Sequence, residues 1–184
     1  MEGAQGALLR FHLLTGAQRC EQLTRLTTRG YDRDAKTFTL MDGKGRRKAI
    51  REHVVPLLPD AVAALDTMAG TAGPFLFTVD GGEHGAVYHT VRDHVAQVAA
   101  AMVEAGETAE PFTPGELRIT VETRLAAAGV SKETRAHLQS HGLGGVQDTH
   151  YDKYKYLDEK RAALETLRSL LEPRGKVVPI RRKA

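Results

Sequence analysis

Two short β-rich segments lie close together in a chain whose other apolar residues mostly follow helical spacing. Residues 36–42 read "KTFTLMD", residues 51–57 read "REHVVPL", and "GKGRRKAI" joins them. Two β-rich runs separated by a glycine-containing turn are typical of a β-hairpin. We therefore expect an α+β fold, mostly helical, with a small antiparallel sheet near its N-terminal end.

The helical patterns begin and end at recognisable residues. A first helix ends at "TG" (15–16), and a short helical segment with Leu23 and Leu26 follows. Further helices are expected over residues 59–70, 86–106, 113–129, 131–141 and 156–173. Proline at a helix start, a serine N-cap and glycine at a helix end mark most of these boundaries. The segment "GPFLFTVDGG" (73–82) fits either a short apolar strand or a buried loop.

Length and composition favour a single intracellular domain. The 184 residues suit one domain with a small appendage, and 41% hydrophobic residues are enough for a core. Cys20 is the only cysteine, so no intrachain disulfide can form and a reducing compartment fits. We recognise neither a signal peptide nor the roughly 20 apolar residues that span a bilayer. We expect a cytoplasmic protein with no membrane partner.

Positive charge is concentrated in two places. The formal net charge is +3, and basic clusters occupy residues 43–51 and 180–184. Such clusters are usually solvated surfaces, yet they also permit binding to nucleic acid. Charge alone leaves both interpretations open.

An ordered set of polar residues runs along the chain: "TGAQR", a lysine on the expected hairpin, "GELR" at a helix start, "QSHG" and "THY". In this order and spacing the set resembles the catalytic domain of the tyrosine recombinases, the phage and mobile-element integrases. The resemblance extends from Leu13 to about Leu171. It implies the DNA breaking-and-rejoining fold and catalytic residues Arg19, Lys44, Arg118, His141 and Tyr151.

The first arginine of the family usually follows the pattern TGxR, and here two alignments are open. If Glu21 is the acidic residue of the family, Gln18 replaces the arginine. If the downstream leucines Leu23 and Leu26 are matched, Arg19 is the arginine. The second alignment keeps both leucines in the core, and we favour it. It places Gln22 where an acidic residue is common.

Two further positions carry alternatives or departures. The family's hairpin lysine is best matched by Lys44, with Lys48 as the second choice. The alternative is a solvated basic hairpin whose lysines have no catalytic role. In the H-x-x-R box of the family, Arg118 matches the arginine, but Gly115 occupies the position of the histidine. This loss removes a group that assists proton removal from the tyrosine.

The last two matches lie in one glycine-rich stretch. His141 in "QSHG" matches the second histidine of the family, and Tyr151 in "THY" matches the nucleophile. Tyr154 and Tyr156 lie nearby, at the expected start of the last helix. His137 and His141 also form an i, i+4 pair, but we find no third metal ligand at a useful spacing. We expect no metal and no cofactor.

The implied chemistry is phosphoryl transfer between DNA strands. Two arginines would hold the non-bridging phosphate oxygens through planar, charge-assisted hydrogen bonds. Tyr151 would attack the phosphorus, Lys44 would protonate the leaving 5′ oxygen, and His141 would donate a hydrogen bond to the phosphate. The 3′-phosphotyrosyl bond retains the bond energy, so rejoining needs no ATP.

We expect residues 1–172 to form the integrase catalytic domain and residues 173–184 a basic tail, with the arm-binding and core-binding domains of longer relatives absent. The expected partners are double-stranded DNA and further copies of the chain, assembled on DNA as a recombination synapse. Because of Gly115, a DNA-binding remnant with impaired cleavage is the main alternative. An unrelated helical binding module is a third interpretation.

Overall fold

A computed structural model describes residues 3–43, 51–141 and 154–172. Within this part of the chain, no helix has the length and apolar character needed to cross a membrane. The helices are α1 (Gly3–Leu14), α2 (Cys20–Leu23), α3 (Pro59–Met68), α4 (Tyr88–Glu104), α5 (Pro114–Ala127), α6 (Lys132–Gln139) and α8 (Leu157–Leu171), with a 3₁₀ turn η1 at Thr28–Gly30. The strands are β1 (Tyr31–Asp32), β2 (Thr37–Asp42) and β3 (Arg51–Pro56).

The three strands form one antiparallel sheet in the order β1-β2-β3. Phe38 pairs with Val55, and Asp42 pairs with Arg51 at the end of the hairpin nearest the connecting segment. Alternate residues of β2 point to the same face of a sheet. Phe38, Leu40 and Asp42 share the buried face, while Met41 is exposed. The buried face of β2 is therefore apolar until its last residue, which is an acid.

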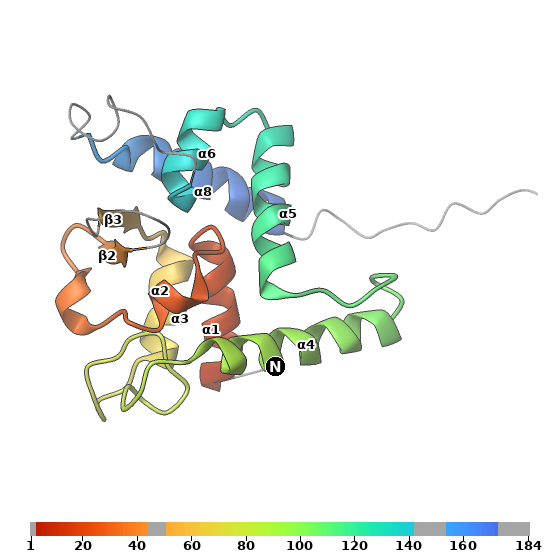
Figure 1. The fold of residues 1–184 in the computed structure, drawn as a ribbon, viewed down its shortest axis with the longest axis horizontal. Coiled ribbons are helices and arrows are strands. Elements are labelled where there is room, and N and C mark those ends of the chain that lie inside the picture. Colours follow the sequence, from red (N-terminus) through yellow and green to blue (C-terminus); the bar gives the residue numbers. More distant parts are fainter. Residues whose placement is uncertain (1–2, 44–50, 142–153, 173–184) are drawn as a thin grey trace, which may run out of the picture.

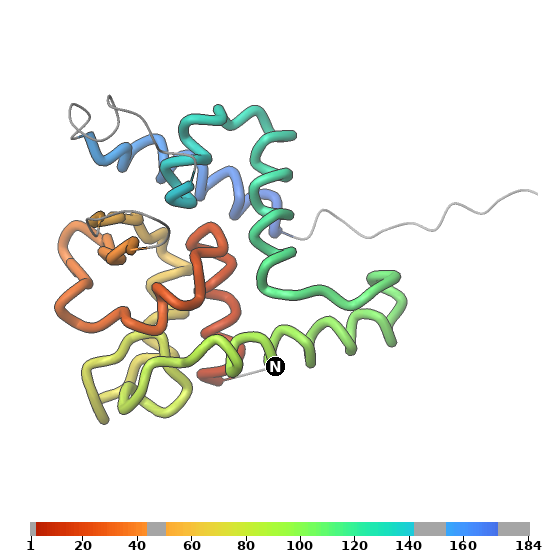
Figure 2. Tube along the Cα trace, viewed as in Figure 1, coloured from red at the N-terminus to blue at the C-terminus, as the bar shows by residue number. Residues whose placement is uncertain are grey.

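The helices enclose α1 and the sheet. α1 packs along α3, and α4 crosses close to α1 (Figure 1). α5 turns away from α4 and runs toward α6 and α8, which lie together on the other side of α1 (Figure 1). The loop between α3 and α4 folds beside the start of α4 (Figure 2). α8 also contacts β3, so the last helix closes the structure against the sheet.

Three phenylalanines join the parts of the core. The ring of Phe11 in α1 lies 5.5 Å from that of Phe38 in β2 and 6.2 Å from that of Phe77 in the α3–α4 loop. All three side chains are fully buried. Tilted aromatic pairs at these distances add to the stabilisation from apolar burial. Substitution of Phe11 by a smaller residue would therefore weaken the packing between α1, the sheet and the α3–α4 loop.

The helix boundaries agree with the sequence signals. Thr113 and Glu116 form a capping box at the start of α5, and the Ser131 hydroxyl accepts a hydrogen bond from the Thr134 amide at the start of α6. Gly129 follows α5 with φ of 85°, a conformation that glycine adopts readily. The mostly helical α+β fold with a small antiparallel sheet is confirmed.

The structure decides one open alternative and shows one buried charge that the sequence pattern does not indicate. Residues 73–82 form a loop with one isolated bridge, Thr27 to Phe75, which is one of the two expected forms of this segment. Lys160, which carries no apolar signal, is buried in α8, and its Nζ donates a 2.7 Å hydrogen bond to the carbonyl of Val54 in β3. Burial lowers the pKa of Lys160 to about 8.

Two buried histidines should make stability depend on acidity. His12 and His53 each direct Nε2 at a backbone carbonyl, that of Gln18 or Leu138, and burial lowers their pKa values to about 4 and about 3. The unfolded chain, with pKa near 6.5, therefore binds more protons as pH falls. The contribution of these histidines to the free energy of unfolding is therefore complete above about pH 6.5. It decreases toward pH 4, by roughly 3 kcal/mol for His12.

Urea unfolding between pH 7 and pH 4 measures this slope. His12→Gln retains an N–H donor without a titrating ring, so its stability should change less with pH than that of the wild type. An equal slope in the two proteins would contradict a neutral, buried His12.

Candidate active site

A tight turn follows α1 and fixes the start of the site. The hydroxyl of Thr15 donates to the carbonyl of Phe11, and Gly16 has φ of 85°. A Cβ atom on Gly16 would lie 3.3 Å from the side chain of Leu138, so both the backbone angle and the close approach favour glycine. The amide of Gln18 donates to the carbonyls of Thr15 and Leu138, each at 2.8 Å. Gln18 therefore holds this turn against α6.

The two alignments of "TGAQR" correspond to different environments. Gln18 is 1% exposed and engaged with backbone carbonyls, whereas the Arg19 side chain is 19% exposed. Leu23 and Leu26 are both buried, as the alignment on Arg19 requires. In this arrangement Arg19, and not Gln18, has a side chain that a ligand can reach.

Arg19 and Arg118 converge on the end of α6. Nη1 of Arg19 donates to the carbonyl of Ser140 at 3.3 Å. Arg118, in the first turns of α5, donates from Nη2 to the adjacent carbonyl of Gln139 and from Nη1 to the carbonyl of Ala17 at 2.8 Å. Two arginines that are distant in the sequence thus bond neighbouring peptide groups, immediately before His141.

The two guanidinium groups are close enough to affect each other. Burial and the positive charge of Arg19 lower the pKa of Arg118 to about 10, while Glu122 and Asp42 act in the opposite direction. Arg118 therefore remains protonated at neutral pH. A paired positive charge of this kind favours an anion between or above the two groups.

His141 lies beside an acid on α5. Its Nε2 is 3.5 Å from Oε2 of Glu122, and its side chain is 39% exposed. The other oxygen of Glu122 accepts a 2.8 Å hydrogen bond from Nε of Arg135. The pair orients the imidazole while leaving part of it accessible, on the side of the molecule where Arg118 lies.

The expected helical pair of His137 and His141 is interrupted. α6 ends at Gln139, and Ser140 has φ of 51°, in the left-handed region, so the two imidazoles do not share a helix face. The ring of His137 instead stacks on Tyr156 with centroids 3.6 Å apart. The tertiary contacts of each histidine thus point away from a shared metal site.

A buried acid lies at the centre of the polar cluster. Asp42 is 2% exposed, and its oxygens accept hydrogen bonds from Nε2 of Gln22 at 2.7 Å and from the hydroxyl of Ser140 at 2.5 Å. Nη2 of Arg51 donates to the same hydroxyl at 2.6 Å. Nη1 of Arg19 lies 3.4 Å from the carboxylate. Our sequence analysis missed these roles of Asp42, Ser140 and Arg51, although the alternation in β2 places Asp42 on the buried face.

Two expected site residues, Lys44 and Tyr151, lie outside the described residues. Residues next to both segments lie at the site: Asp42 and Arg51 stand on the two sides of the hairpin connection, and His141 precedes the tyrosine segment. The rival Tyr154 donates a hydrogen bond to Glu159 at 3.3 Å. Partial desolvation and the Glu159 carboxylate raise the pKa of Tyr154, which disfavours the phenolate that a nucleophile needs.

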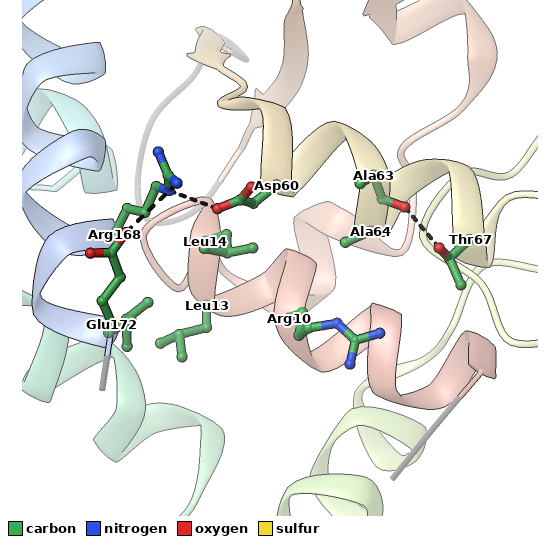
Figure 3. A pocket seen from close by; sticks show the side chains of 10 residues that line it. Arg10, Leu13, Leu14, Asp60, Ala63, Ala64, Thr67, Arg168 and Glu172 are labelled. Atoms are coloured by element: carbon green, nitrogen blue, oxygen red, sulfur yellow. Dashed lines mark hydrogen bonds and ion pairs between the residues drawn. The ribbon is translucent and has the colours of Figure 1, made fainter. Parts of the chain in front are cut away.

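Two pockets differ in their relation to this cluster. A pocket of about 330 Å³ is lined by Arg19, Gln22, Arg25 and Met41, among others, and opens beside the arginine. A larger pocket, of about 600 Å³, lies between α1, α3 and the end of α8 (Figure 3). An ion pair between Arg168 and Asp60 borders it (Figure 3). Of the expected catalytic residues that the structure describes, Arg19, Arg118 and His141, none lines this larger pocket, so its size does not make it the candidate active site.

There is space for a side chain at position 115, where the resemblance predicts a histidine. Gly115 is exposed in the first turn of α5, and a Cβ atom there would meet only the Thr113 hydroxyl, at 3.7 Å. Residues 115 and 118 are three apart on a helix and therefore lie on the same side. A larger side chain at this position would thus fit without displacing the described neighbours.

Solved structures similar to this chain include integrases and recombinases. The integrase of mycobacterium phage Brujita matches 98% of this chain and 56% of its own, with 20% identity and a TM-score of 0.62. The Tn1549 transposon integrase, in complex with a circular intermediate DNA, matches 88% of this chain and 57% of its own, with 19% identity and a TM-score of 0.57. XerA recombinase matches 92% and 58%, with 19% identity and a TM-score of 0.53.

The chain thus spans somewhat more than half the length of these solved proteins. No protein-family model matches it, and no curated protein is significantly similar to it. The likeness in structure confirms the fold of a tyrosine recombinase catalytic domain, and it rules out an unrelated helical fold.

Proposed function

We propose that this domain cleaves and rejoins DNA strands through a phosphotyrosyl intermediate, in site-specific recombination. The observation that carries the proposal is the convergence of Arg19 and Arg118 on the carbonyls of Ser140 and Gln139, next to His141. Solved proteins of the same fold include a transposon integrase bound to DNA. Fold and polar cluster support the same chemistry independently.

In the proposed reaction, the scissile phosphate binds against Arg19 and Arg118, with His141 as a further hydrogen-bond donor. The phenol of Tyr151 loses its proton to solvent water and its oxygen attacks phosphorus; the bond to the 5′ oxygen breaks, and Lys44 gives that oxygen a proton. A 5′ hydroxyl of a second strand then attacks the phosphotyrosyl bond and releases the tyrosine. The arginines neutralise charge that grows in each transition state, where fixed donors act most strongly.

Recombination joins strands from two DNA duplexes, so we propose that several copies of the chain assemble on DNA. The partner is double-stranded DNA, bound first through its phosphates by basic residues. Integration or excision of a phage or mobile element is the setting that this chemistry suits.

Supercoiled plasmid, incubated with the protein in the presence of EDTA, tests the proposal. We expect metal-independent relaxation and, after addition of SDS, a covalent protein–DNA adduct. Retention of DNA at low salt without relaxation or adduct would favour the alternative, a DNA-binding remnant with impaired cleavage. Absence of any DNA affinity would contradict both.

The alternative is favoured by one specific observation, the glycine at position 115. Gly115→His is expected to raise the cleavage rate by about tenfold or more, because a positioned imidazole can assist proton removal from the tyrosine. Single-turnover cleavage of a nicked duplex measures the rate.

Gly115→Ala is the matched control for this substitution. It adds helix propensity worth about 0.5–1 kcal/mol without an imidazole, so it should stabilise α5 and leave cleavage unchanged. Equal cleavage rates for Gly115→His and Gly115→Ala would contradict this prediction, because they would mean that an imidazole at residue 115 does not assist proton transfer.

A further inference from the structure

Asp42 occupies a place where β2 would ordinarily bury an apolar side chain. It follows Phe38 and Leu40 on the buried face and is 2% exposed. Burying a carboxylate is costly unless the charge is paired and its oxygens are hydrogen-bonded. The cost points to a task for this acid that an apolar residue could not perform.

The contacts of Asp42 lead to Arg19. Gln22 and Ser140 donate hydrogen bonds of 2.7 and 2.5 Å to its two oxygens, and they hold the carboxylate in a fixed orientation. Nη1 of Arg19 lies 3.4 and 3.5 Å from the same oxygens and also donates to the Ser140 carbonyl. One edge of the guanidinium is therefore tied to β2 and to the end of α6.

The remaining edge of Arg19 has no such ties. Its Nε and Nη2 make no hydrogen bond to the described residues, and the side chain is 19% exposed beside the 330 Å³ pocket. A guanidinium fixed at one edge presents the other in a set direction, which suits planar recognition of a phosphate. Asp42 also offsets the charge that Arg19 and Arg118 share.

We propose that Asp42 is a positioning residue for Arg19, and that it supplies from β2 the carboxylate that the resemblance leads us to expect at position 22. Gln22 carries no charge, but its side-chain amide donates a hydrogen bond to Asp42, so the carboxylate lies directly beside position 22. This proposal rests on the proposed function, because it assigns Arg19 to the phosphate.

Two variants test the proposal. Asp42→Asn removes the charge, and Asp66→Asn, an exposed residue of α3, is a control with the same change in net charge. The double variant Gln22→Glu/Asp42→Asn moves the acid to position 22. In it, the new asparagine can donate to the new glutamate and accept from the Ser140 hydroxyl, so the two shortest hydrogen bonds of Asp42 each have a counterpart.

Two readouts separate positioning from activity. The first is the ¹H–¹⁵N spectrum of the Arg19 guanidinium, assigned with Arg19→Lys, in which restricted rotation gives resolved Nη signals. The second is single-turnover cleavage of a nicked duplex. We expect Asp42→Asn to lose the resolved signals and about 100-fold in cleavage, as for a misplaced reacting group, and the double variant to recover both.

Resolved Arg19 signals in Asp42→Asn would overturn the proposal, as would a folded double variant that lacks them. If Asp42→Asn does not fold, the double variant decides by the same criterion. If the wild type does not cleave DNA at all, the proposed function fails, and the spectra still decide whether Asp42 orients Arg19.

Discussion

Replacing Arg118 by lysine is expected to lower DNA cleavage by about 10²- to 10³-fold, the cost of losing one fixed donor to a developing charge. Arg118 donates to the carbonyls of Ala17 and Gln139 and still faces the site next to Arg19. A lysine keeps one positive charge, but a single ammonium cannot reproduce the planar fork that meets both carbonyls. The decrease should appear in the cleavage rate measured at a saturating concentration of DNA.

Arg124→Lys is the control, because Arg124 lies on the same helix but is exposed. It should cleave and bind DNA as the wild type does. DNA affinity of Arg118→Lys should change little, since the charge is retained and most of the affinity comes from other phosphate contacts. Thermal unfolding of both variants shows whether the fold is intact. Cleavage by folded Arg118→Lys at the wild-type rate would exclude Arg118 from the reaction.

Replacing Tyr151 by phenylalanine is expected to abolish cleavage and adduct formation, a loss of at least about 10⁴-fold, because the attacking oxygen itself is removed. The change leaves ring size and hydrophobicity nearly the same. DNA binding should therefore persist. Electrophoresis in SDS after incubation with a nicked duplex measures the adduct.

Tyr154→Phe and Tyr156→Phe are the controls for Tyr151→Phe. Tyr154 is bonded to Glu159, and Tyr156 stacks on His137 and donates to Glu133, so both hydroxyls already have structural partners. Each control should cleave DNA at close to the wild-type rate. A loss of cleavage in Tyr154→Phe, with an unchanged Tyr151→Phe, would move the nucleophile to Tyr154.

The helices and the hairpin could be predicted from local signals. Capping by Thr113 and Ser131 and the glycine after α5 act within a few residues, so the sequence carries them directly. The alternation of side chains in β2 likewise places Phe38, Leu40 and Asp42 on one face of the strand. These signals do not depend on which distant element packs against the segment.

The polar cluster depended on contacts that no local signal contains. Ser140 ends α6 in a left-handed conformation, and its hydroxyl bridges Asp42 and Arg51, residues of a distant hairpin. Lys160 is buried because the Val54 carbonyl accepts its hydrogen bond. The resemblance supplied Arg19, Arg118 and His141 as an ordered set, but the acid that contacts Arg19 could be assigned only in three dimensions.

In the proposed reaction a tyrosine of this chain becomes bonded to DNA. Protease digestion of the SDS-resistant adduct, followed by mass spectrometry of the nucleotide-bearing peptide, identifies the bonded residue directly. We expect a phosphodiester on Tyr151, attached to a 3′ end. A nucleotide on any other residue, or a cleaved DNA with no covalent protein attached, would contradict it.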